Sequence, residues 1–182
     1  MKKILALALT LFLTGTALAS DMGVIIGIRN DSAESKSAGV DMASQNNFQA
    51  GLIAKFDVSD AVLIRSGFVY IQRNYLATVA ASDVTLKYNY FEIPIGVLYK
   101  FNDFGGAFAG VALSLNQSKS SSVSGMEPTG VKSMIMPIQI GASFKFAPQM
   151  GAELYFETNG GDIDDNLQNN KAIVANLMIT FE

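Results

Sequence analysis

The segment YFEIPIGVLYKF at residues 90–101 alternates apolar side chains with polar or small ones at a period of two. Successive side chains of a β-strand point to opposite faces, so this period predicts a strand with two unlike faces. One face is an unbroken apolar row of Phe91, Ile93, Ile95, Val97, Tyr99 and Phe101. The other face consists of Tyr90, Glu92, Pro94, Gly96, Leu98 and Lys100. Such a strand needs an apolar solvent on one side and a polar interior on the other.

Seven further segments show the same alternation. They cover residues 23–30, 48–56, 62–75, 107–116, 138–146, 152–157 and 173–181, and the quoted segment extends back to residue 86. Closing the strands into a ring removes every unpaired sheet edge and turns the apolar faces toward a bilayer. The sequence therefore predicts an all-β fold, an eight-stranded antiparallel up-and-down transmembrane β-barrel.

The connections between these segments alternate in length. The short ones are residues 57–60, 102–103 and 147–149, and the long polar ones are residues 31–46, 76–85, 117–130 and 159–169. In outer-membrane barrels the short turns face the periplasm and the long loops face outside. An even number of strands then places both termini on the periplasmic side.

The N-terminus reads MKKILALALTLFLTGTALAS and has the three parts of a secretory signal. Lys2 and Lys3 form the basic region, residues 4–13 form an apolar stretch too short to cross a bilayer, and Ala17-Leu18-Ala19 fits a cleavage site. The alternative is an N-terminal core helix. We expect a signal peptide at residues 1–19 and a barrel domain at residues 20–182.

The composition narrows the class of protein. Apolar residues make up 49% of the chain, which contains no cysteine, histidine or tryptophan. Without Lys2 and Lys3 the chain has 11 basic and 16 acidic residues, and this balance argues against nucleic acid as a partner. After the signal, no apolar run approaches the ~20 residues of a spanning helix.

A soluble β-sandwich is the competing fold, and two features favour the membrane. Aromatic residues stand beside the short turns, where an interfacial girdle would lie; they are Phe56, Tyr99, Phe101, Phe144 and Phe146. Charged residues also lie deep within strands, and a sandwich core would not tolerate them. A sandwich would carry the same charges on its solvent face, so the charges alone leave this alternative open.

The face opposite the apolar rows carries charges of both signs. They are Arg29, Lys55, Arg65, Arg73, Glu92, Lys100, Lys145, Glu153 and Glu157. The interior of an eight-stranded barrel is just filled by side chains, and unpaired buried charge is costly. We therefore expect a plug of salt bridges, with Arg65 paired to Glu92 on the adjacent strand. The alternative is a selective ion path through the same interior.

Catalysis and metal binding have weaker signals. The chain has no histidine to act as a general base, so we expect no enzymatic activity and no cofactor. Asp162, Asp164 and Asp165 in the segment GGDIDDN carry oxygens of the kind that calcium prefers. The alternative for these three residues is a solvated acidic loop.

The residues of two consecutive strands carry a family resemblance. IRSGFVYIQRNY at residues 64–75 followed by YFEIPIGVLYKF resembles the porin-like outer-membrane β-barrel domain related to the PorT group. In that family a strand reading Arg-x-Gly-aromatic-x-Tyr precedes one reading Tyr-x-Glu-Ile-Pro and then Lys-aromatic. The family is functionally mixed, so the resemblance implies a bacterial outer-membrane location and a barrel more than an activity.

The last strand resembles the C-terminal signal that the barrel insertion machinery reads. Leu177, Ile179 and Phe181 are the candidate residues, with Glu182 after the aromatic. We expect a non-catalytic protein with a structural or surface-interaction role through four external loops, and the alternative is a small porin-like channel for ions or small solutes. The expected partners are outer-membrane lipid, the insertion machinery during assembly and an extracellular ligand, and we expect a monomer.

Overall fold

The computed structural model describes residues 21–79 and 82–181, and the expected signal peptide at residues 1–19 lies outside them. Ten strands occur in these ranges. They are β1 (Asp21–Ser35), β2 (Val40–Ala43), β3 (Gln45–Asp57), β4 (Val62–Val79), β5 (Ser82–Asn102), β6 (Gly105–Ser121), β7 (Met134–Ile135), β8 (Ile138–Ala147), β9 (Met150–Asp162) and β10 (Leu167–Phe181).

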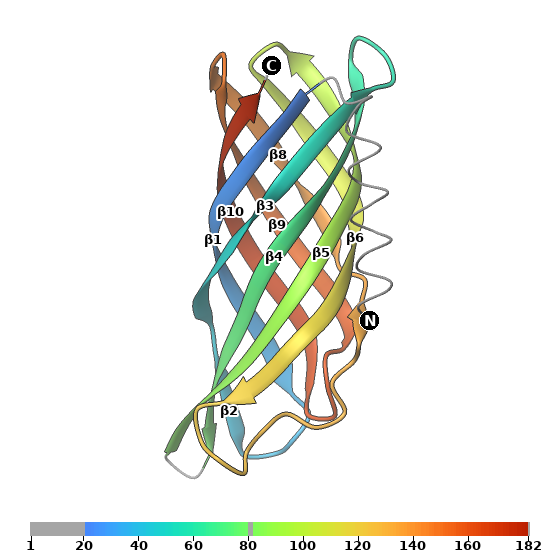
Figure 1. The fold of residues 1–182 in the computed structure, drawn as a ribbon. Helices are drawn as coiled ribbons and strands as arrows, with labels where there is room; N and C mark the ends of the chain where they lie inside the picture. The colour runs from blue at the N-terminus through green and yellow to red at the C-terminus, as the bar shows by residue number, and fades with distance from the viewer. Residues whose placement is uncertain (1–20, 80–81, 182) are drawn as a thin grey trace.

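Eight of these strands form one closed antiparallel ring (Figure 1). Its order is β1, β3, β4, β5, β6, β8, β9 and β10, and β10 pairs again with β1. The closing seam begins where Met22 lies opposite Phe181 and continues to Ser35 opposite Leu167. All eight predicted strands are present, so the predicted fold class is confirmed. Because the ring is a single sheet closed on itself, the soluble sandwich is excluded.

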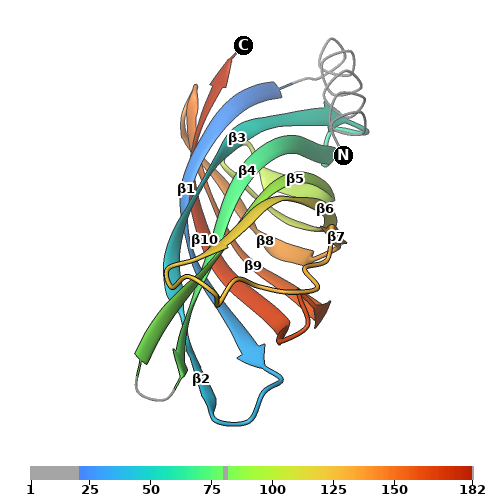
Figure 2. The same ribbon diagram turned by 60° about the horizontal axis from the view of Figure 1, so that its bottom comes forward.

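The two ends of the barrel differ. The three short turns, after β3, β5 and β8, share one end with the start of β1 and the end of β10, at the top of Figure 1; we call it the turn end. The opposite end, which comes forward in Figure 2, holds the longer connections and is called the loop end. The three predicted short turns are therefore confirmed, and they span residues 58–61, 103–104 and 148–149.

The predicted long loops contain more strand than expected. β4 and β5 continue as a hairpin to Val79 and from Ser82, across the predicted loop at residues 76–85. β2 pairs with the far end of β4, so that Val40 lies opposite Val79. Residues of this hairpin such as Thr78, Val79 and Val84 have high strand propensity, and pairing satisfies their backbone groups. A sheet therefore projects at the loop end.

The inner and outer faces of the wall are clearly separated. Large apolar side chains point outward along the strands; Ile28 is 70% exposed, Ile140 59% and Ile173 62%. Tyr99, beside a short turn, is also exposed on this surface, and its ring centroid lies 5.8 Å from that of Phe101. In residues 21–79 and 82–181, no helix is long and apolar enough to cross a bilayer. The outer face has the character of a surface in contact with lipid.

Candidate functional site: the barrel interior and its two ends

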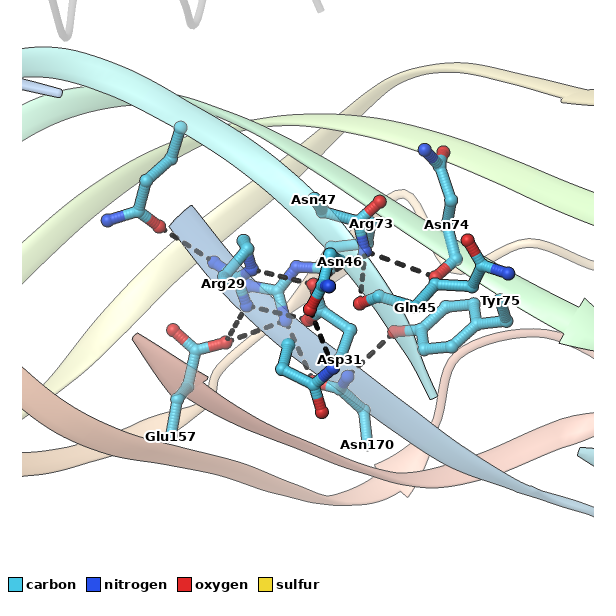
Figure 3. A network of polar contacts seen from close by, with 12 residues as sticks. Arg29, Asp31, Gln45, Asn46, Asn47, Arg73, Asn74, Tyr75, Glu157 and Asn170 are labelled. Atoms are coloured by element: carbon cyan, nitrogen blue, oxygen red, sulfur yellow. Dashed lines mark hydrogen bonds and ion pairs between the residues drawn. The ribbon is translucent and has the colours of Figure 1, made fainter. Parts of the chain in front are cut away.

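Five ionised side chains from the four strands β1, β4, β5 and β9 meet inside the barrel and form what we call the central ion cluster. They are Arg29, Asp31, Arg73, Glu92 and Glu157, and each is at most 1% exposed. Glu157 links the two arginines, because its Oε1 lies 2.8 Å from Arg29 Nη2 and 2.7 Å from Arg73 Nη1 (Figure 3). The alternation of each strand points these residues inward, so the cluster joins opposite sides of the wall.

Asp31 is the member of the cluster that the sequence patterns missed. Arg29 donates to its two carboxylate oxygens at 2.9 Å each, through Nε and Nη2. Asn47 donates to the same carboxylate at 2.9 Å. Asp31 was assigned to a long loop, yet β1 continues to Ser35 and places it two residues after Arg29 on the same face. Extending the alternation of the first strand by two residues would have found it.

The second half of the cluster surrounds Glu92. Arg73 Nη2 lies 2.8 Å from Glu92 Oε2, and the hydroxyl of Ser114 donates to the same oxygen. The amide of Gln139 donates to Glu92 at 2.7 Å and to Glu157 at 2.9 Å. One amide group therefore holds two carboxylates that would otherwise repel each other. Such charge-assisted hydrogen bonds compensate for the loss of water around buried ions.

The predicted pair of Arg65 and Glu92 is wrong. Arg65 binds Glu153 instead, with its Nε 2.9 Å from Oε1 and its Nη2 2.6 Å from Oε2. Glu92 lies opposite Val69 of β4, four positions from Arg65 on one side and four from Arg73 on the other, and it binds Arg73. The register alone therefore does not decide the partner, because Arg65 extends across the interior to Glu153 on β9. The Arg65 guanidinium also lies 4.7 Å from the centre of the Phe108 ring.

Neutral polar side chains connect this pair with the central ion cluster. Gln49 donates to Asn176 Oδ1 at 2.7 Å and to the Tyr155 hydroxyl at 3.0 Å, and it accepts from Arg29 at 3.0 Å. Asn176 in turn donates to Glu153 at 3.4 Å. Ions and amides therefore form a continuous polar column in the interior, and apolar side chains such as Ile25 and Ile71 pack around it.

The remaining predicted interior charges lie at the turn end. Lys55, Lys100 and Lys145 line a cavity of about 370 Å³ that opens there. Lys55 is buried, with its Nζ 3.7 Å from Asp21 Oδ2, whereas Lys145 is exposed. The nine predicted charges therefore divide into six that pair deep in the barrel and three around this mouth.

The three candidate calcium ligands have separate partners at the loop end. Asp162 lies 2.8 Å from Lys36, beyond the apolar belt, and this hydrogen bond lowers the pKa of its carboxyl below the usual value. Asp164 accepts from Tyr88 Oη at 2.5 Å and from the backbone N–H of Leu167 at 2.7 Å, and so stabilises the turn before β10. Asp165 is exposed. Among residues 21–79 and 82–181, no three His, Cys, Asp or Glu side chains gather in an arrangement that suits a metal ion.

The candidate assembly residues lie on the outer face of the last strand. Leu177, Ile179 and Phe181 are 38%, 43% and 57% exposed. They lie along the closing seam, where Phe181 is paired with Met22 of β1 at the turn end. Their role in assembly stays a prediction.

Comparison with known protein families defines the class of protein. Residues 17–171 match the family described as outer membrane protein beta-barrel domain, and the chain belongs to this family. A comparison with curated protein sequences returns no match. The location is therefore the bacterial outer membrane, with the barrel in the lipid bilayer.

Two solved structures share the fold. Neisserial surface protein A (NspA) is 19% identical with a TM-score of 0.58, over 88% of this chain and 97% of that one. The attachment invasion locus protein Ail of Yersinia pestis is 12% identical with a TM-score of 0.53, over 88% of this chain and 98% of that one. Both are small outer-membrane barrels, and in such barrels short turns face the periplasm. By this rule we expect the turn end to face the periplasm and the loop end to face the exterior.

Proposed function

We propose that the protein is a non-catalytic surface protein whose barrel is a closed anchor and whose loop end contacts a partner outside the cell. The observation that carries this proposal is the polar column, since Arg29, Arg73 and Glu157 join opposite walls without an intervening space. A wide aqueous pore needs more strands than eight. Displacing one member of the cluster to open a path would leave its partners buried and unpaired.

The loop end offers the surface for such a contact. The β4–β5 hairpin and β2 extend the sheet at this end, and the segment between β6 and β7 lies beside them (Figure 2). Carboxylates outnumber ammonium groups there. The exposed acidic residues are Glu34, Asp41, Asp83, Glu127, Asp162 and Asp165, and the exposed basic ones are Lys36, Lys87, Lys119, Lys132 and Lys171. We infer a neutral or basic partner surface, since a polyanion would meet net repulsion.

This inference separates the protein from one of its structural neighbours. The structure of Ail was determined in complex with the heparin analogue sucrose octasulfate. For the present protein in neutral-lipid nanodiscs, we expect no saturable binding of sucrose octasulfate at physiological salt. Saturable binding would overturn the proposed partner chemistry and would leave the anchor role untouched.

The second candidate function is a small channel for ions or small solutes, and the cavity at the turn end is the observation that favours it. Single-channel recording in planar bilayers distinguishes the two functions. We expect silence, because the central ion cluster occupies the cross-section of the barrel. A steady open level that vanishes when the protein is heat-denatured before reconstitution would favour the channel.

Three finer assignments complete the proposal. The strand motifs at residues 64–75 and 90–101 support a relation to the PorT group within the family. We further propose that export removes residues 1–19, which the mass of the protein isolated from outer membranes would test. The protein assembles through the barrel insertion machinery as a monomer, which cross-linking in native membranes would test.

A further inference from the structure

The cavity at the turn end is lined by charged and polar side chains of strands that are far apart in the sequence. We call it the turn-end cavity. Its lining includes Lys55 of β3, Lys100 of β5 and both Ser143 and Lys145 of β8. Gly105 and Gly106 of β6 lie in the same lining and leave its volume of about 370 Å³ free of side chains on that strand. The cavity lies at the turn end, whose strands and turns are at the top of Figure 1.

Three lysines and three aspartates line this cavity, and one of the lysines faces a further cation. Lys55 lies directly opposite Arg65 in the β3–β4 register, and like charges in opposite positions destabilise a sheet. The nearby carboxylates are already engaged, since Glu153 binds Arg65 in two places and Asp21 lies 3.7 Å from Lys55. Lys100 and Lys145 add two further positive charges that point to the same side of the wall.

The polar groups around the cavity include donors without acceptors. Among the described residues, neither Lys100 nor Lys145 has a carboxylate within 4.0 Å. Ser143 is 6% exposed, and its hydroxyl makes no hydrogen bond to any described residue. A hydroxyl and two ammonium groups around one opening are a set of donors without an acceptor from the described part of the protein, and they are open to an acceptor from solution.

Two aspartates at the rim do not fill this role. Asp57 and Asp103 lie at the turns, where both are exposed to water. Neither lies within 4.0 Å of Lys100 or Lys145 in the described part of the chain. Water and salt screen the charges of these two aspartates and of the exposed Lys145 alike, so the case for the cavity depends on its arrangement of donors.

We propose that the turn-end cavity binds a small oxyanion, a phosphate or carboxylate group, between Lys100, Lys145 and the Ser143 hydroxyl. Each ammonium group would donate a charge-assisted hydrogen bond to an anionic oxygen, and the hydroxyl would donate a third bond. The same group occurs in soluble periplasmic anions and in lipid headgroups of the inner leaflet. The proposal does not depend on the surface role, because the cavity lies at the opposite end of the barrel.

The test is a titration of the ¹⁵N-labelled protein, folded in neutral maltoside micelles, with inorganic phosphate at constant ionic strength set by sodium chloride. The amide signals of Gly105, Gly106 and Ser143 report on the cavity. We expect saturable shifts of these signals and no comparable shift at the loop end. A parallel titration with phosphatidylglycerol in the same micelles identifies the source: a response to phosphate assigns a soluble anion, and a response to the lipid alone assigns a headgroup. No saturable shift with either probe overturns the proposal.

Matched variants separate the cavity from general charge effects. In the variant carrying Lys100→Gln and Lys145→Gln, we expect phosphate affinity to fall by about tenfold or more, which is at least about 1.4 kcal/mol. The control carries Lys87→Gln and Lys132→Gln, which remove two exposed lysines at the loop end. Equal affinity in the two double variants would overturn the site. Ser143→Ala, a smaller change, should weaken binding severalfold, and unchanged affinity would remove Ser143 from the site.

Discussion

The inner and outer faces of the barrel wall differ in the charges that they carry. Ile95 is 54% exposed on the outer face, in a row that contains no charged residue from Phe91 to Phe101. Glu92, in the same strand, is 1% exposed on the inner face and is held by Arg73, Ser114 and Gln139. The outer face needs only apolar character, because lipid packs against any such surface. The inner face needs specific partners, because each charge there depends on another.

The largest effect should follow from removing a charge that two others share. Glu157→Ala leaves both Arg29 and Arg73 without their common carboxylate, and we expect a loss of about 3–5 kcal/mol in the free energy of unfolding. Urea titration of protein in liposomes, followed by the heat-modifiable gel shift, measures this loss. Glu127→Ala, at an exposed loop position, is the matched control and should change stability by less than about 0.5 kcal/mol. Similar losses in both variants would contradict the bridging role of Glu157.

Adding a charge to the outer face should have the next largest effect. Ile95→Arg places a cation against lipid, and we expect a cost of about 2–4 kcal/mol or failure to fold. Gln117→Arg, beyond the apolar belt on β6, should cost about 0–1 kcal/mol. A substitution on the inner face of the same strand, Gly96→Ser, would be a poor control. A Cβ at this position would approach the backbone oxygen of Ala109 to 2.9 Å. Equal folding yields of the two arginine variants in liposomes would refute the assignment of the outer face.

A double-mutant cycle sharpens the comparison within the interior. Removing Arg65 alone or Glu153 alone leaves a buried charge, so we expect the double variant to be more stable than the single effects added together, with a coupling energy of about 0.5–3 kcal/mol. The same cycle for Arg65 and Glu92 should show much weaker coupling, because no contact joins them. Additive effects at Arg65 and Glu153 would mean that their ion pair adds nothing to stability.

The smallest effect on stability is expected at Phe181, the last residue of the outward apolar row of β10. In cells, the same residue should affect how much protein reaches the outer membrane. On our proposal that the insertion machinery reads the terminal aromatic row, Phe181→Ala should lower the amount of protein that reaches the outer membrane. Refolding of the purified variant should change less, since that reaction has no receptor. Deletion of Glu182 serves as the control and should leave the amount unchanged. Immunoblots of outer-membrane fractions that show Phe181→Ala at the level of the unmodified protein would disprove the role of this residue.

The fold could be predicted well from the sequence because the outer face follows a simple rule. An apolar residue at every second position, as in Ile138, Ile140, Ala142 and Phe144, indicates both the strand and the face that meets lipid. The alternation does not reveal how neighbouring strands are aligned with each other. The pairs Arg65–Glu153 and Arg73–Glu92 depend on where each residue lies along the barrel axis and on the direction in which its side chain extends. The alternation reports neither.

The polar interior and the loop end were predicted only in part for the same physical reason. Asp31, Gln49 and Gln139 complete the buried network, yet polar residues on a strand's inner face have no signature that distinguishes a network member from a solvated side chain. At the loop end the strands leave the bilayer, so the outer residues no longer need to be apolar. The alternation therefore fades before the strands end, and β2 and the tip of the β4–β5 hairpin went unrecognised.

The first and last strands, β1 and β10, pair with each other as the other neighbouring strands of the ring do. The closed ring therefore does not require the chain to begin at β1. Met22 and Phe181 are opposite one another at the turn end, so a short linker would join the original termini and the ring could be reopened at another turn. A circular permutant that begins at Met150 and ends at Ala147 would retain each pair of neighbouring strands. Its last strand would be β8, with the outward rings of Phe144 and Phe146 near the new C-terminus. The order of the strands along the chain can thus be changed separately from the shape of the barrel.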